Sequence, residues 1–430
     1  MVNSKTEEYI EQICSYVKFK RAHKEIQIEL LDHIEEKTEH LLLTGIAKEE
    51  ALDKALIEMG QPEIIGKQLN ESHKAAPEWT ILAITVLLSL LGLISNYLIS
   101  INKIVPYSTT FSRTIIYNIT AYIFMLSLYF FDYKKLEKHS IKIFIGITLI
   151  LLLQLLITSP VNGMKAWLPL GPISIKTTEL SLFLYVISLS KLIKSLDLKN
   201  ILSYLYLSLM LTIPIILYIS LRVSMETVTY FAIFIVLMFI SKVKKTYIFS
   251  VIGGFMVGCS IMVFSEPYRL QRFLVFVKPL SDSDGAGYVY IQTQKVLSSV
   301  GLKGNGFTFP KNTLPIVDSD FILTYIIYTF GWIAGIALII LFITFVIRIF
   351  TAAVKIKDTF GRFIIQGFMC IFFMEFTWNI LMILGLAPII SVSLPFVSYG
   401  GSRTIIQMGA IGVIMSIYKS KSLSPMPEYE

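Results

Sequence analysis

Charged residues are scarce in this sequence, and their scarcity excludes a soluble globular protein. Only 16% of the 430 residues are charged, while 54% are hydrophobic, and the mean hydropathy is +0.68. Because soluble domains carry about 25% charged residues, much of this surface must face lipid. Cysteine is also rare, and Cys14, Cys259 and Cys370 lie too far apart in the sequence to suggest a disulfide framework.

Histidine and several common catalytic motifs are missing where chemistry at an outer membrane face would need them. The five histidines lie in the polar N-terminal segment or in a loop expected to be cytosolic: His23, His33, His40, His73 and His139. No Walker A loop, HExxH helix or Gly-x-Ser-x-Gly elbow occurs, which argues against an ATPase, a zincin and a serine hydrolase. Chemistry at the outer face must then use carboxylates, basic residues and hydroxyls.

The charges separate an acidic head from a basic body. Residues 1–78 hold 10 Lys and Arg against 16 Asp and Glu, and the later residues hold 28 against 14. Apolar residues recur at helical spacing within residues 6–73, which predicts four short amphipathic helices. Thr44-Gly45 and the Gly60-Gln61-Pro62 segment mark helix ends. We therefore expect a small soluble helical domain over residues 1–75.

The body, residues 79–421, is predicted to be an all-α polytopic membrane domain of about ten helices. Apolar runs cover residues 79–100, 112–131, 141–158, 178–193, 201–220, 227–241, 246–265, 321–349, 363–386 and 399–418. Alternate connections and the tail carry 16 Lys and Arg, so the positive-inside rule places both termini in the cytoplasm. Residues 266–320 form a large external loop, and loops of that length are usually functional.

Asp320 is the principal candidate for acid–base chemistry. The segment Asp318-Ser319-Asp320 ends the external loop directly before an apolar helix. This position suits a helix N-cap, and it equally suits a general base at the level of the lipid headgroups. Glu179 opens the fourth span and Glu375 lies in the ninth. Intramembrane carboxylates of this kind serve function or interhelical hydrogen bonding.

Two features could bind an anion at the outer face. Arg269 and Arg272, three residues apart at the end of the seventh span, are placed to clamp a lipid-linked pyrophosphate, although snorkelling to the interface explains them as well. The second feature is an extended turn at residues 394–402, Leu-Pro-Phe-Val-Ser-Tyr-Gly-Gly-Ser. Its glycines allow close backbone approach, and its amides can meet an anion.

Residues 394–402 resemble the hallmark motif of the SEDS family (RodA/FtsW/SpoVE-like) of shape, elongation, division and sporulation proteins. Other motifs follow in the family's order: Asn162-Gly163, Trp167, Gly285-Ala286-Gly287-Tyr288, and Pro315-x-x-x-Ser319-Asp320. The likeness covers about residues 79–418 and has the same ten-span topology. Residues 51–62 resemble a helical prefix domain found ahead of some membrane proteins of Gram-positive bacteria.

The resemblance implies a peptidoglycan glycosyltransferase that polymerises lipid II at the outer face of the cytoplasmic membrane, for cell shape, division or sporulation. It implies that Asp320 deprotonates the 4-hydroxyl of an acceptor sugar. A divalent cation (Mg²⁺ or Mn²⁺) is a candidate cofactor and a class B penicillin-binding protein the expected partner, with no nucleic acid involved. The candidate substrate-binding residues are Lys165, Trp167, Glu179, Arg269, Arg272, Ser398, Tyr399, Gly400, Gly401 and Ser402.

The sequence also departs from the family's pattern. Residues 222–227 have no clear counterpart of its Gln-Pro-Asp-Leu-Gly-Thr motif, and Lys176-Thr177-Thr178 replaces Gln-Pro-Ser. Leu182 stands where a lysine is usual, and Ile316 and Asp318 replace a glutamate and a histidine. We interpret these changes as a loss of polar groups around the expected active site. A flippase for a polyprenyl-linked precursor and a catalytically silent scaffold therefore stay open as alternatives.

Overall fold

The computed structural model describes residues 4–18, 20, 23–72, 77–104, 110–171, 173–264, 267–283, 285, 287–310 and 313–420. The chain divides into two compact units. One comprises Met1–Pro77, Val354–Thr359 and Ile417–Glu430, and the other comprises Glu78–Ala353 and Phe360–Ser416.

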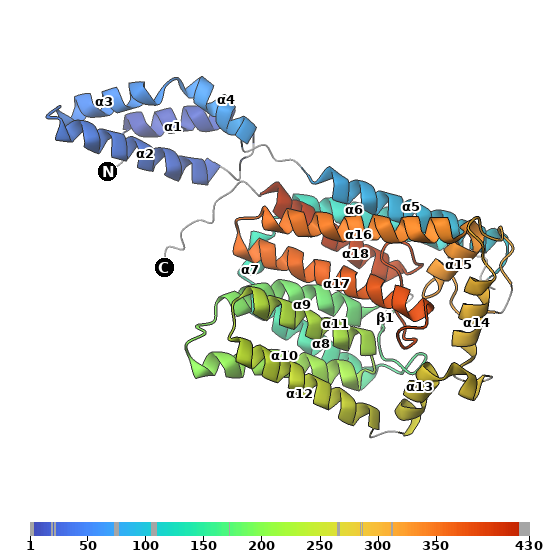
Figure 1. The fold of residues 1–430 in the computed structure, drawn as a ribbon. Helices are drawn as coiled ribbons and strands as arrows, with labels where there is room; N and C mark the ends of the chain where they lie inside the picture. The colour runs from blue at the N-terminus through green and yellow to red at the C-terminus, as the bar shows by residue number, and fades with distance from the viewer. Residues whose placement is uncertain are drawn as a thin grey trace. The chain divides into compact units, whose positions relative to one another are not determined.

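The first unit contains the four helices expected in the head (Figure 1): α1 (Ser4–Tyr16), α2 (His23–Leu43), α3 (Lys48–Met59) and α4 (Pro62–Ser72). Helix α1 packs against α2 and α4, and α2 packs against α3. Their apolar faces form a core that includes Ile13, Ile26 and Ile34. Gly45 and Gly60 adopt positive φ angles of 88° and 99° between the helices, so the predicted helix stops are confirmed.

A bundle of long apolar helices forms the second unit (Figure 1). Each expected apolar run coincides with one or two helices. These are α5 (Trp79–Ile101), α6 (Thr110–Phe130), α8 (Ser140–Ile157), α9 (Thr177–Lys194), α10 (Ile201–Ser220), α11 (Ser224–Ile240), α12 (Lys245–Phe264), α15 (Ile322–Phe330), α16 (Trp332–Val354), α17 (Thr359–Ile383) and α18 (Gly401–Lys419).

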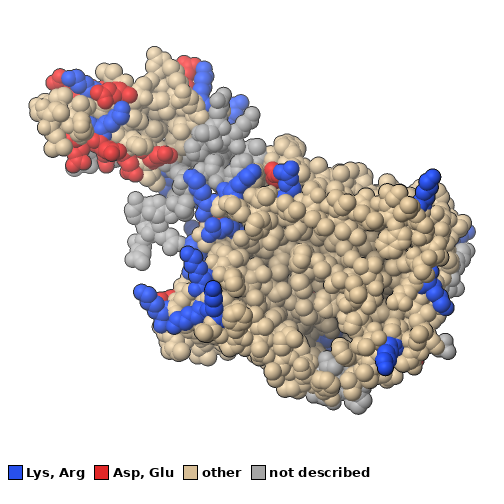
Figure 2. All heavy atoms as spheres, viewed as in Figure 1, with Lys and Arg blue, Asp and Glu red and all other residues tan. Residues whose placement is uncertain are grey.

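Several of these helices have the length and surface of membrane spans. Among the described residues, six helices are long and apolar enough to cross a membrane, namely α5, α8, α10, α12, α16 and α17, and α11 is a shorter apolar helix. Figure 2 shows an almost uncharged side of the bundle with Lys and Arg near its two ends. Large apolar side chains such as Leu87, Ile123 and Leu149 are exposed on the bundle's surface. The predicted multi-span, all-helical fold class is confirmed.

The eighth apolar run is two helices rather than the single one expected. Helix α15 ends at Phe330, and Gly331, whose φ is 90°, separates it from α16, which begins at Trp332. A side chain at Gly331 would collide with the backbone of Leu302 and Gly304 in the long loop that precedes α15. The break therefore lets that loop pack against the backbone. It also makes α15 a short helix that follows Asp320.

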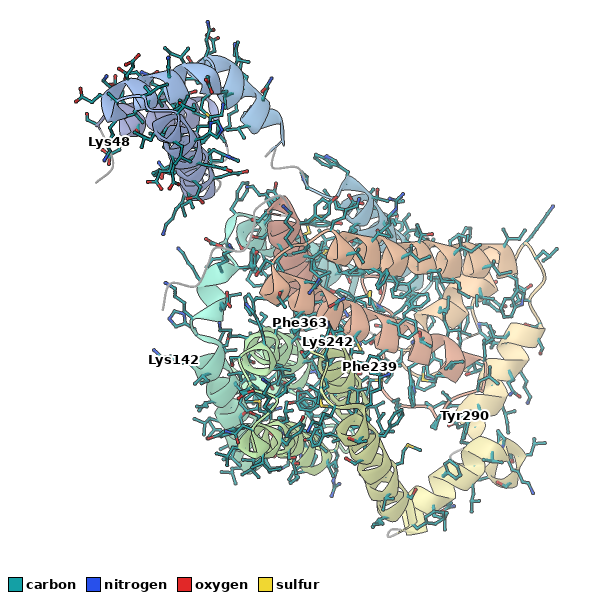
Figure 3. All side chains as sticks on the ribbon, turned by 60° about the vertical axis from the view of Figure 1, so that its left-hand side comes forward. Lys48, Lys142, Phe239, Lys242, Tyr290 and Phe363 are labelled. Atoms are coloured by element: carbon teal, nitrogen blue, oxygen red, sulfur yellow. The ribbon has the colours of Figure 1, made fainter. Side chains whose placement is uncertain are left out.

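The two loops predicted to be external contain regular structure. The large loop holds α13 (Pro267–Val277), the 3-10 helix η2 (Pro279–Asp282) and α14 (Tyr288–Ser298). The loop between α8 and α9 forms a small antiparallel hairpin, β1 (Leu168–Leu170) with β2 (Ile173–Ile175), which the all-α prediction lacked. A short helix, α7 (Lys134–Glu137), lies between α6 and α8. In Figure 3, Tyr290 of α14 lies at one end of the bundle and Lys142 of α8 at the other.

Candidate active site around Asp320

The turn at residues 394–402 holds the backbone that precedes α15. The Tyr399 N–H donates to the carbonyl of Asp318 at 2.9 Å. The Ser398 hydroxyl donates to the carbonyl of Ser319 at 2.8 Å, and the same hydroxyl accepts the N–H of Leu394 at 2.8 Å. Two consecutive residues of the turn, Ser398 and Tyr399, therefore bind two consecutive carbonyls of the segment that precedes α15.

The carbonyl of Asp320 is held by a third element, helix α17. Asn379 Nδ2 donates to that carbonyl at 2.9 Å and to the carbonyl of Val392 at 2.8 Å. Asn379 is fully buried, so both bonds form away from water. Three successive carbonyls, from Asp318 to Asp320, are thus each bound by a residue of the C-terminal part of the chain.

The Asp320 side chain is largely buried, with 6% of the residue exposed. Its Oδ1 atom accepts the hydroxyl of Ser393 at 3.0 Å, and the hydroxyl of Ser319 lies 3.4 Å away. Among the described residues, no donor reaches Oδ2. The carboxylate is therefore oriented by its neighbours and keeps one oxygen for another hydroxyl, as a general base requires.

Asp318 places a second carboxyl group beside Asp320. Burial raises the pKa of the Asp318 carboxyl, and the charge of Asp320 raises it further, while a hydrogen bond to its own backbone lowers it. The charges of Asp318 and of Arg113, near the start of α6, both act on the Tyr399 hydroxyl. Arg113 is exposed, so this end of the site has a cation that the sequence analysis did not identify.

The turn itself is packed tightly by α5 and α6. A side chain added at Gly92 of α5 would collide with the backbone of Val397. One added at Gly401 would lie 2.7 Å from the ring of Tyr117 in α6. Phe396 has a positive φ of 64°, which is uncommon for a residue with a large side chain. These contacts explain why glycine and an irregular backbone occur here.

A cluster of buried charges lies behind the turn. Arg403 Nε donates to Glu179 Oε2 at 2.6 Å, with 11% and 1% of the two side chains exposed. Gln407 donates to Glu375 at 2.9 Å and accepts the N–H of Phe396 at 3.1 Å. The positive charge of Arg403 also interacts with the carboxylate of Asp320. The cluster therefore connects the intramembrane carboxylates to the turn that holds the candidate base.

Lys176 supplies the second cation of this cluster. Its Nζ lies 2.9 Å from Glu226 and 3.5 Å from Glu179, and Thr178 also donates to Glu226 at 3.1 Å. Our interpretation that the departures remove polar groups is wrong for this part of the site. Lys176, which directly precedes α9, lies three residues before Glu179, and Leu182 of α9 lies three residues after it, so each is a neighbour of Glu179 on the helix surface.

The other predicted substrate-binding residues have different surroundings. Lys165 is half-buried and donates to the carbonyl of Leu155 at 2.7 Å. Trp167 is half-buried next to β1. Ser402 accepts the N–H of Lys176 at 3.1 Å, which joins the starts of α9 and α18. Arg269 and Arg272 both lie in α13, and their side chains are outside the described residues.

Several residues of the site escaped the sequence analysis. Ser393 precedes the recognised turn and looks like any buried serine. Arg403 and Gln407 had a usable signal, because polar residues four apart in an apolar helix lie on one face. Arg113 had the same kind of signal, as a single charge in the first turn of an apolar helix.

Comparison with known proteins identifies the family. Residues 77–423 match the family model for the FtsW/RodA/SpoVE group, described as "Cell cycle protein". The chain is 28% identical to the probable peptidoglycan glycosyltransferase FtsW of Borreliella burgdorferi over 311 residues, 70% of this chain and 85% of that protein. It is 27% identical to the stage V sporulation protein E of Bacillus subtilis over 361 residues, 80% of this chain and 98% of that one.

Solved structures show the same fold. A chain from a peptidoglycan synthase complex, studied for its coordination of polymerization and crosslinking, matches with a TM-score of 0.69 at 19% identity, covering 80% of this chain and 98% of that one. The rod shape determining protein RodA of Thermus thermophilus matches with a TM-score of 0.62 at 18% identity, covering 81% and 98%. The family model covers most of the chain, so this protein belongs to the FtsW/RodA/SpoVE family.

Proposed function

We propose that this protein is a peptidoglycan glycosyltransferase that polymerises lipid II, with Asp320 as the general base. The observation that carries the proposal is the Asp320 carboxylate, which is oriented through Oδ1 and keeps Oδ2 without a donor among the described residues. The similarity to proteins named peptidoglycan glycosyltransferases supports the activity. Lipid II and the outer face of the membrane are parts of the proposal.

The reaction needs one base and a good leaving group. Asp320 Oδ2 takes the proton of the acceptor's 4-hydroxyl as that oxygen attacks the anomeric carbon of the donor. The bond between the anomeric carbon and the lipid pyrophosphate breaks, and the pyrophosphate leaves with the electron pair. The displacement inverts the anomeric centre, and a single carboxylate in hydrogen-bond reach of the hydroxyl is sufficient for it.

In this proposal, arginine side chains stabilise the leaving pyrophosphate. Arg113 is exposed beside Tyr399, and Arg269 and Arg272 lie three residues apart in α13. Guanidinium groups match phosphate oxygens in a bidentate manner and stay charged. Lys165 contributes less in this proposal, because its ammonium is bound to the carbonyl of Leu155.

A divalent cation fits this site only when the pyrophosphate of the substrate binds it. Among the described residues, no group of three or more His, Cys, Asp or Glu side chains is arranged to hold a metal ion. One oxygen of Asp320 is already bound by serine. Mg²⁺ often binds through substrate phosphates and few protein carboxylates, so a cation carried by the pyrophosphate is the form we propose.

The partner and the location follow from the same proposal. A solved relative comes from a complex that coordinates polymerization with crosslinking, and a class B penicillin-binding protein would supply crosslinking here. The basic connections orient the chain with both termini in the cytoplasm. The Asp320 end of the bundle then faces outward, where lipid II is consumed in a Gram-positive cell.

A polymerisation assay tests the function. Purified protein with labelled lipid II should form glycan polymer, and Asp320→Asn should form none. Asp282→Asn is the matched control, since it changes an aspartate in the same external loop outside the site. Polymer from Asp320→Asn at the wild-type rate would refute the base. If no protein forms polymer and the wild type and Asp320→Asn move lipid II equally across vesicle membranes, the flippase alternative replaces the proposal.

A further inference from the structure

Ser393 connects the segment that contains Ser319 and Asp320 with the segment that directly precedes the turn at residues 394–402. Its hydroxyl is 3.0 Å from Asp320 Oδ1 and 2.8 Å from the hydroxyl of Ser319. The Ser319 hydroxyl is farther from the same Oδ1 atom, at 3.4 Å. Ser393 is only 2% exposed, so its hydrogen bonds do not compete with bulk water.

The order of donors in this group follows from the number of protons. A serine hydroxyl carries one proton, and an ionised carboxylate carries none. The shorter contact with Oδ1 therefore uses the proton of Ser393. The contact between the two hydroxyls must then use the proton of Ser319, so that the hydrogen bonds run from Ser319 to Ser393 to Asp320. Such a chain is cooperative, because each donor is polarised by the next.

We infer that Ser393 is a positioning residue that makes Oδ2 of Asp320 the catalytic oxygen, an inference that rests on the proposed function. With Oδ1 bound by Ser393, the lone pairs of Oδ2 are the ones available to an acceptor hydroxyl. The carboxylate is also fixed in rotation, because both Oδ1 and the backbone of Asp320 are bound. Ser393 acts through Asp320 and does not touch the reacting atoms.

The backbone on both sides of Ser393 is bound as well. The carbonyl of Val392 accepts Asn379 Nδ2, which also binds the carbonyl of Asp320. The N–H of Leu394 donates to Ser398, whose hydroxyl donates to Ser319. The two segments are therefore connected on either side of the serine contact. This arrangement fixes the distance between Ser393 and the carboxylate, which a positioning role requires.

Initial rates of lipid II polymerisation by the full-length protein test the inference. Ser393→Ala should lower kcat about 10- to 100-fold, the effect of losing a hydrogen bond to a charged group, and should leave KM unchanged. Ser393→Cys keeps the shape and a weaker donor, so its kcat should lie between those of the alanine variant and the wild type. Ser319→Ala should lower kcat less than Ser393→Ala, because the bond to Oδ1 survives.

Ser190→Ala is the matched control, since Ser190 is a fully buried serine that donates to a backbone carbonyl in α9. It should keep wild-type kinetics. The inference is overturned if Ser393→Ala keeps the wild-type kcat, or if a loss in kcat/KM comes from KM. It is also overturned if the cysteine and alanine variants lose activity to the same extent and both unfold at a correspondingly lower temperature. Full activity of Asp320→Asn would instead refute the proposed function itself.

Discussion

Removing Arg403 should destabilise the membrane unit strongly, because it leaves buried carboxylates without their main cation. In the wild type, the cluster contains the carboxylates Glu179, Glu226 and Glu375 and the cations Arg403 and Lys176. The Arg403 and Glu179 side chains are 11% and 1% exposed, and their atoms are 2.6 Å apart. Breaking such a buried pair by removing one partner costs about 3–5 kcal/mol. We expect Arg403→Leu to lose stability in this range.

The double variant Arg403→Leu with Glu179→Gln tests the physical reason. The substituted amide would carry no charge and would still offer Gln407 a hydrogen-bond partner, so most of the lost stability should return. Arg348→Leu is the control, because Arg348 is exposed near the end of α16. Unfolding of the detergent-solubilised protein, followed by helical circular dichroism, measures the wild type and the three variants. Our reasoning fails if Arg403→Leu is as stable as Arg348→Leu, or if the double variant is no more stable than the single one.

Two further predictions concern the turn and its neighbours. Burial raises the pKa of the Asp318 carboxyl, so Asp318→Asn should stabilise the protein at neutral pH. This gain in stability should shrink as the pH falls toward about 4, the usual pKa of an aspartate. Unfolding curves at several pH values would contradict the prediction if the difference in stability between the variant and the wild type did not change with pH. Gly401→Ala should cost about 1–3 kcal/mol and lower polymerase activity, because its Cβ would meet Tyr117 at 2.7 Å, whereas Gly400→Ala, with its nearest neighbour at 3.4 Å, should be tolerated.

The sequence predicted the helices well because hydropathy and helix stops are local signals. The ten apolar runs and the four head helices each have counterparts in the structure. The division of the eighth run at Gly331 was not predicted, since the residues on both sides are apolar and the cause is a distant backbone contact. The hairpin at Leu168–Leu170 and Ile173–Ile175 was missed because three-residue strands have almost no periodicity.

The candidate site was only partly predictable, for a different physical reason. Asp320, Ser398 and Tyr399 were identified from a motif, but the motif does not say that these residues share one set of hydrogen bonds. Those bonds end on backbone carbonyls, which every residue has, so side-chain identity does not reveal the acceptors. Ser393 was missed for another reason, because a buried serine in a loop has no distinguishing pattern before the fold brings it to the Asp320 carboxylate.

The unusual residues around Glu179 make sense only as a set. When each is considered separately, the departures at Lys176 and Glu226 were interpreted as a loss of the family's usual polar groups. In the structure their charged atoms are 2.9 Å apart, and Lys176 also lies 3.5 Å from Glu179. Without Lys176, three buried carboxylates would share the single charge of Arg403, a costly arrangement at low dielectric. Lys176 therefore supplies the second positive charge that this buried group needs, while Leu182 of α9 is itself buried and apolar.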